Sequence, residues 1–486
     1  MFINNPATPW KYSLLSVGFM RLTTVYNMDL RPGMVLRYDV TAQPYKTSST
    51  PPISFDQKRH CSLGTRPGSW MAVAFALPSA ATDTQLEQAW LQVIQRHETL
   101  RTRVVNPSNP ALEMVHVSSG QWSAARPSHP RVRLSSTFTS STDPRRVLRE
   151  VFDEACDPFA TPSHQMCVVD HTTHIDPQAA SMTGDGDLTP HQFTDATVVI
   201  GLDHCHTDAW SLLVLIRDFT AFLHAIQAGT SGSLTPSPVL PPAHSFGEHT
   251  RDLLARPLAP AAVHSAWKRI MEVDGQMPTF PLPLGDLSEP RDQVVKIHDV
   301  VDAEGLQSLE TAAQKRGVRL LGVAVAAMAP LKAVFPVHSR RQPFTPPRTW
   351  AQAMGWFITN SVIRCSSSDP QEAMKSVKEA IKLGSYPLEP LLEPWGGMPH
   401  TTGMLAVSWL DNRKLPVQVD PALDPQHVSA EIKVNGVMLW FVVNHDGMHI
   451  RVRYPDTPEA RSNVSGWCRS VCESIREFAG TSHAAA

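Results

Sequence analysis

One stretch, VVIGLDHCHTDAWSLLVLIRDF at residues 198–219, constrains this chain more than any other. Its first three residues are β-branched and apolar, which predicts the end of a buried strand. From Trp210 onward apolar residues recur at roughly helical spacing, so a helix follows after a few polar residues. Thr207 or Asp208 can cap that helix, because either side chain accepts hydrogen bonds from backbone N–H groups that otherwise lack a partner. The pattern therefore places His204 where a strand ends, so that its side chain can be held over a cleft.

The polar residues of this stretch resemble the active-site motif of the condensation-domain family, whose fold is shared with chloramphenicol acetyltransferase and the polyketide-associated (Pap) acyltransferases. The family pattern is two adjacent histidines, three free positions, then Asp-Gly. Here Asp203 and His204 stand at the histidine positions, and Asp208 and Ala209 stand at the Asp-Gly positions. The resemblance implies that His204 is the catalytic base and that Asp208 is a structural partner that shapes the loop. Asp203 and Ala209 depart from the pattern, and Ala209 adds a methyl group where the family usually keeps the channel open.

Further segments resemble this family in the order that the family has. They are PISFDQ at residues 52–57, RHETLRT at 96–102, MGWFITN at 354–360, SWLDNRKLP at 408–416 and RVRYPDTPEAR at 451–461. The last two resemble the Pap branch more than the peptide-forming condensation domains. Taken together, the resemblance implies an α/β fold of two chloramphenicol-acetyltransferase-like lobes. These lobes would form a V-shaped pseudo-dimer with His204 in a central tunnel.

The best domain boundary lies at residues 228–244, AGTSGSLTPSPVLPPAH, where Gly, Ser and Pro replace periodic apolar residues as in a linker. We therefore predict an N-terminal lobe over 1–227, which carries the histidine motif, and a C-terminal lobe over 245–486. At 486 residues the chain is long enough for both. Early in the second lobe the sequence predicts one long helix over 245–271. A second, apolar helix is predicted over 320–334.

Composition excludes several kinds of partner. A net charge of −2 provides no basic field for nucleic acid. The seven cysteines are scattered and lack a CxxC pair, which predicts reduced thiols and a cytoplasmic protein. No histidine spacing reproduces a zinc pattern, so we expect no metal. No stretch approaches the ~20 apolar residues of a membrane span. We therefore expect a chain that is not transmembrane, with a peripheral role at a membrane left open.

The chemistry expected of His204 is general base catalysis. A neutral imidazole, with an unperturbed pKa near 6.5, can take a proton from an alcohol or amine as that group attacks a thioester, and no covalent intermediate is needed. The acyl group would arrive on CoA or on phosphopantetheine, as substrate, and no cofactor is required. The tetrahedral oxyanion needs a hydrogen-bond donor, for which the backbone N–H groups beside Ala209 and the Ser408 hydroxyl are candidates. Asp203 is a further candidate for lining the tunnel, and if charged and close it would raise the pKa of His204.

Three functions remain open on the sequence. The first, favoured by the Pap-like segments, is an acyltransferase of lipid or secondary-metabolite biosynthesis. It would move a fatty or polyketide acyl group from CoA or a carrier protein to a hydroxyl of a glycolipid or secondary metabolite. The second is a free-standing condensation enzyme that forms an amide between substrates bound to acyl or peptidyl carrier proteins. The third is an inactive scaffold, which the departures at Asp203 and Ala209 support and the retention of His204 opposes.

Overall fold

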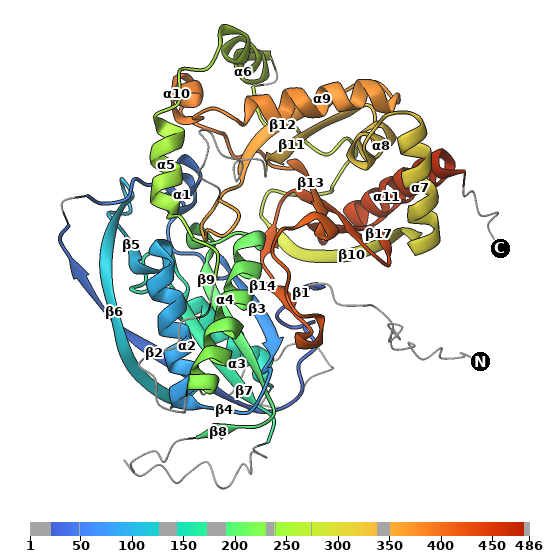
Figure 1. Cartoon of the computed structure of the whole chain (residues 1–486). Coiled ribbons are helices and arrows are strands. Elements are labelled where there is room, and N and C mark those ends of the chain that lie inside the picture. The colour runs from blue at the N-terminus through green and yellow to red at the C-terminus, as the bar shows by residue number, and fades with distance from the viewer. Residues whose placement is uncertain are drawn as a thin grey trace.

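The computed structural model describes residues 21–47, 49–125, 143–172, 191–229, 238, 240–273, 275–337 and 350–480. Two large β-sheets dominate these residues, one in each half of the molecule, and helices cover both (Figure 1). The first sheet has the strand order β1 (Arg21–Thr24), β14 (Gln426–Ser429), β3 (Trp70–Ala76), β9 (Ala196–Asp203), β7 (His164–Asp170), β2 (Met34–Tyr45), β6 (Ala111–Ala124) and β5 (Thr102–Val105). The second sheet has the order β12 (Thr359–Cys365), β11 (Leu331–Val337), β13 (Leu405–Asp411), β16 (Val437–Asn444), β17 (Gly447–Pro455), β10 (Arg291–Asp302) and β15 (Lys433–Val434). A small sheet pairs β4 (Ala81–Thr82) with β8 (Gln192–Phe193).

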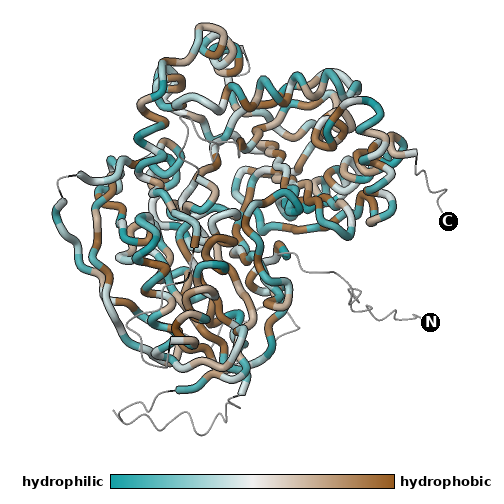
Figure 2. The backbone as a smooth tube through the Cα atoms, in the orientation of Figure 1, coloured by the Kyte–Doolittle hydropathy of each residue, from teal (hydrophilic) through white to brown (hydrophobic). Residues whose placement is uncertain are grey.

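In chain order, the first helices are α1 (Phe55–Cys61), α2 (Asp83–Arg96), α3 (Pro144–Ala155) and α4 (Ala209–Ala228). The later helices are α5 (Phe246–Leu254), α6 (Ala261–Val273), α7 (Ala303–Lys315), α8 (Leu320–Ala327), α9 (Pro370–Leu383), α10 (Glu389–Leu392) and α11 (Pro458–Ala479). Figure 2 shows hydrophobic residues concentrated along the strands and the helix sides that meet them.

Residue alternation along the strands gives the first sheet two buried faces. On β3, Val73 and Phe75 pack into a core with α2 and α4, whereas Ala72 and Ala74 pack against α3.

Among the described residues, α4 is the one helix long and apolar enough to cross a membrane, with a mean hydropathy of 1.4 over an 18-residue segment. Because 61% of that segment is buried inside the structure, α4 has the character of a core helix.

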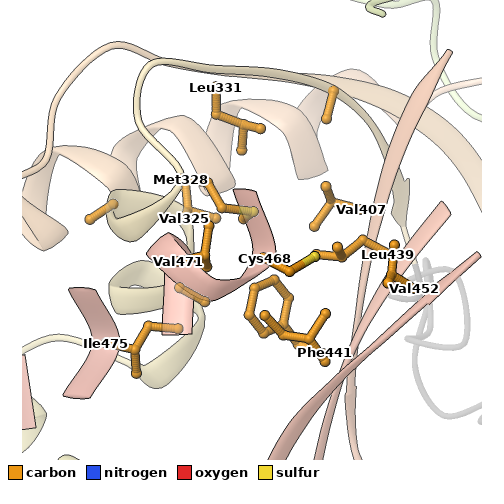
Figure 3. Packing of buried hydrophobic residues seen from close by; sticks show 14 of the residues in the cluster. Val325, Met328, Leu331, Val407, Leu439, Phe441, Val452, Cys468, Val471 and Ile475 are labelled. Atoms are coloured by element: carbon orange, nitrogen blue, oxygen red, sulfur yellow. The ribbon is translucent and has the colours of Figure 1, made fainter. Parts of the chain in front are cut away.

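The second sheet packs one face against α7, α8 and α11. Leu439, Phe441 and Val452, from β16 and β17, meet Val325 of α8 and Cys468 of α11 (Figure 3). Different groups of side chains cover different parts of the opposite face of this sheet. At the β11 and β12 side it is covered by a smaller cluster that includes residues of α6 and α10.

Two of the predicted helices are wrong in extent, and proline explains both. The helix predicted over 245–271 is split into α5 and α6, because Pro257 and Pro260 cannot continue an α-helix. The helix predicted over 320–334 ends at Ala327, and β11 takes up the chain from Leu331. Pro330 lies between them, and it lacks the N–H that the next helical turn requires.

One strand from the C-terminal half lies in the first sheet. β14 pairs in parallel with β1 and antiparallel with β3, so His427 lies opposite Val73. Leu423, just before this strand, packs into the core beneath α2 and α4. The lobe boundary predicted at 228–244 lies partly outside the described residues and stays a prediction. Because β14 comes from the C-terminal half of the chain, the first sheet contains strands from both halves.

Candidate active site

The strand, turn and helix predicted around the histidine motif are present. β9 ends at Asp203, a short 3-10 turn η3 (His204–His206) follows, and α4 begins at Ala209. The His204 N–H donates to the Ser69 carbonyl over 3.1 Å, which ties the turn to the start of β3. His204 therefore lies at the end of a central strand.

An aromatic side chain from the second half of the chain holds the ring of His204. The imidazole stacks on Trp356 with ring centroids 4.0 Å apart and planes inclined by 26°. His204 keeps part of its surface exposed, while its buried Nδ1 atom has no hydrogen-bond partner among the described residues. The ring is thus held by stacking, and no described carboxylate forms an ion pair with it.

Asp203, the last residue of β9, is fully buried and makes several hydrogen bonds. Its carboxylate accepts hydrogen bonds from the Ser69 hydroxyl at 2.7 Å, the Cys205 N–H at 2.9 Å and His60 Nε2 at 3.0 Å. The second ring nitrogen of His60, Nδ1, lies 3.1 Å from Arg66 Nη2. Because a guanidinium only donates, Nδ1 accepts, and His60 must carry its proton on Nε2. Arg66, His60 and Asp203 therefore form a directed hydrogen-bond chain.

The electrostatic setting keeps His204 neutral. Burial lowers the pKa of His204, and nearby His60 lowers it further, which outweighs the raising effects of Asp203 and Asp208. The raising effect predicted for Asp203 is therefore present, but burial and His60 outweigh it. Burial acts to raise the pKa of Asp203, but the hydrogen bonds from His60, Cys205 and Ser69 hold it below its ordinary value. At neutral pH an ionised Asp203 thus stands beside an uncharged His204, the form that can accept a proton.

Asp208 joins the start of α4 to the second half of the chain. Its Oδ1 accepts hydrogen bonds from the N–H and hydroxyl of Ser211, each at 2.8 Å, so Asp208 is the N-cap of α4. Its Oδ2 accepts from the Phe357 N–H at 3.2 Å, next to Trp356. The Ser211 hydroxyl also donates to the Gly355 carbonyl at 2.9 Å. One buried carboxylate therefore fixes both the helix and the segment that carries the stacking tryptophan.

The two candidate oxyanion donors lie on different elements. Ala209 is the partly exposed first residue of α4, where backbone N–H groups have no carbonyl partner within the helix. Ser408 is buried in β13, opposite Trp440 of β16, which in turn lies opposite Arg451 of β17. Residues directly opposite in register point to the same side, so these three side chains share one face of the second sheet. The roles of Ala209 and Ser408 stay predictions.

A further buried histidine, His427 of β14, lies within electrostatic reach of the site. Burial lowers its pKa to about 3, with added lowering from Arg451 and His204 and an opposing effect of Asp208. The motif did not predict His427, His60 or Trp356. His60 lies just after segment 52–57, and Trp356 lies within segment 354–360, but both segments were recognised for other residues. Nothing in the sequence pointed to His427.

Metal and thiol chemistry find no support in the residues near the motif. Within the described ranges, no group of three or more His, Cys, Asp or Glu side chains could hold a metal ion. Cys205 is buried, and burial raises the pKa of its thiol well above the usual value. The thiol therefore stays protonated at neutral pH, unlike a reactive nucleophile.

Known proteins resemble this chain in sequence and in fold, although no protein-family model matches it. The acyltransferase PapA3 of Mycobacterium tuberculosis is 26% identical over 308 residues, which cover 58% of this chain and 64% of the relative. The match thus spans less than two thirds of that relative's length. Among solved structures, the PapA2 acyl transferase superposes with a TM-score of 0.72 at 19% identity, over 95% of this chain and 100% of that one. The X-domain from teicoplanin biosynthesis superposes with a TM-score of 0.62 at 16% identity, over 90% of this chain and 97% of that one.

These likenesses confirm the predicted resemblance to condensation-domain-like Pap acyltransferases. The fold class, a mixed α/β architecture of this type, is also confirmed, because the PapA2 superposition includes nearly the whole chain. The V shape and the central tunnel stay predictions.

Proposed function

We propose that this chain, which has the fold of the condensation-domain-like acyltransferases, moves an acyl group from a thioester to a hydroxyl. The donor would be a fatty or polyketide acyl group on CoA or on a carrier protein. The acceptor would be a glycolipid or secondary metabolite. The observation that carries this proposal is a neutral His204 at the end of β9, stacked on Trp356 and unpaired with any described carboxylate.

In this mechanism His204 accepts the proton of the acceptor hydroxyl as its oxygen attacks the thioester carbon. The new C–O bond gives a tetrahedral oxyanion, which donors beside Ala209 or Ser408 would stabilise. The oxyanion collapses, the C–S bond breaks, and the departing thiolate takes the proton back from His204. General base catalysis of this kind contributes about 10²–10⁴-fold to rate. Asp208 would act by fixing the turn and Trp356 rather than by moving a proton.

The departure at Asp203 is compatible with this chemistry. His60 returns an imidazole to the neighbourhood of the replaced histidine, with its ring centroid 6.2 Å from that of His204. Its hydrogen bond pairs the buried Asp203 carboxylate, and the net pKa of His204 is lowered despite the charge of Asp203. We therefore favour an active enzyme over an inactive scaffold.

An amine acceptor would use the same base, so amide formation remains the second candidate. A carrier protein is a partner in both candidate functions, ester formation and amide formation. We also place the chain in the cytoplasm, because its seven cysteines are all free.

The test is acyl transfer from a panel of acyl-CoA and acyl-carrier donors to sugar, lipid and amine acceptors, with products identified by mass spectrometry. An ester product that His204→Ala abolishes is expected. The matched control is His224→Ala, an exposed histidine on α4, which should leave the product unchanged. An amide product would favour the condensation alternative, and a product that His204→Ala fails to reduce would remove His204 as the base.

A further inference from the structure

Two arginines of β17 lie on the face of the second sheet that turns away from the large hydrophobic core. Arg451 and Arg453 stand two positions apart, so both side chains leave the strand on the same side. Their neighbours Ile450 and Val452 point the other way, into the core with α8 and α11. Only 7% of Arg451 is exposed, and Arg453 is half-buried.

Neither guanidinium has a carboxylate within ion-pair distance among the described residues. Both lie against the ring of Trp440 instead, with guanidinium carbons 4.9 Å and 5.5 Å from the ring centroid. Burial lowers the pKa of each arginine to about 10, and for Arg451 the charge of Arg453 adds to the lowering. Two like charges taken out of water without a counter-charge are costly, and the aromatic ring offsets only part of that cost. The arrangement is that of a site whose counter-charge comes from a ligand.

His427 connects this pair to the candidate active site. It is only 7% exposed, and its Nδ1 atom has no hydrogen-bond partner among the described residues. Arg451, His204 and Asp208 all act electrostatically on His427. His427 therefore lies within electrostatic reach of both Arg451 and the proposed base His204.

We propose that Arg451, Arg453 and His427 bind an oxyanion carried by the acyl acceptor: a phosphate, sulfate or carboxylate group. The inference rests on the proposed function and names the acceptor class that it would take. A guanidinium matches such groups with two parallel N–H donors, and His427 Nδ1 is available as a third donor when protonated there. The donor's phosphates fit less well. In CoA they lie a full pantetheine arm away from the thioester carbon, whereas His427 of this cluster is within electrostatic reach of His204.

The first test measures binding and needs no catalytic activity. Thermal unfolding of the full chain is followed while inorganic phosphate or glucose 6-phosphate is titrated against sodium chloride at equal ionic strength. The variants are Arg451→Met and Arg453→Met. The control is Arg291→Met, which removes a partly exposed arginine on the adjacent strand β10 that pairs with Asp286.

The wild type and Arg291→Met should show a saturable rise in Tm of about 2 °C or more. Both β17 variants should lose that rise. They should also be no less stable than the wild type in chloride, because removing an unpaired buried charge relieves repulsion. General stabilisation by phosphate as a salt would persist in every variant, so an unchanged response in Arg451→Met and Arg453→Met overturns the proposal.

A second titration, with CoA and with glucose 6-phosphate, separates donor from acceptor. Loss of glucose 6-phosphate binding in Arg451→Met, with CoA binding retained, supports the acceptor site. Loss of CoA binding alone overturns it. If no acyl transfer is ever detected, the anion response still decides whether the site exists, so failure of this inference and of the proposed function can be told apart.

Discussion

The bond between His60 and Asp203 gives a stability prediction that can be worked from the structure. His60→Phe keeps a ring of similar size but removes the N–H that donates to the fully buried carboxylate over 3.0 Å. Hydrogen bonds to charged groups contribute about 1.5–3 kcal/mol, so the free energy of unfolding at pH 7 should fall by about that amount. The Ser69 and Cys205 donors remain and should prevent a larger loss.

The pH dependence of this effect has a definite sign. The folded pKa of Asp203 is depressed, so its ionised form stabilises the fold above the unfolded pKa near 3.9, and that contribution disappears as pH falls through the folded pKa. In His60→Phe the depression is smaller. The difference between the variant and the wild type should therefore be largest at neutral pH and shrink below about pH 4.

Urea denaturation of both proteins at several pH values measures this difference. The control is His116→Phe, which changes an exposed histidine on β6 and should alter the free energy of unfolding by less than about 0.5 kcal/mol. If His60→Phe matches the wild type at every pH, the hydrogen-bond chain has no energetic role and the interpretation of Asp203 is wrong.

Three further predictions concern the residues around His204. Trp356→Ala removes the stacking surface, so acyl transfer should fall at least 10-fold in kcat/KM while the unfolding midpoint changes modestly; loss of stability alone would contradict a positioning role. Asp208→Ala removes the N-cap of α4 and the bond to Phe357, and urea denaturation should show a loss of about 2–4 kcal/mol. Because the pKa of His204 is lowered, kcat/KM should be level around pH 7 and fall only below about pH 6.5, whereas a fall that begins above pH 7 would indicate a raised pKa.

The local structure of the motif could be predicted because its signals are local. A β-branched run ends in Asp203, Asp208 caps the next helix, and the spacing of apolar residues defines α4. The two mispredicted helices show the limit of periodicity, since Pro257 and Pro330 interrupt apolar patterns that would otherwise continue.

Residues that arrive from distant parts of the chain could not be predicted this way. His60 reaches Asp203 across 143 positions, and the Phe357 N–H reaches Asp208 across 149. The first contact depends on tertiary packing within the first half of the chain and the second on packing between the halves, which no short pattern encodes. His427 reaches the site because β14 crosses into the first sheet, a pairing decided by tertiary structure.

The central claim is that His204 is the base of acyl transfer, and the most direct test is the kcat/KM of wild type and His204→Ala with one donor and acceptor pair that gives product. We expect a loss of about 10²–10⁴-fold in the variant, with urea denaturation midpoints that agree within error. A variant that folds normally and retains wild-type kcat/KM would contradict the assignment of His204 as the base.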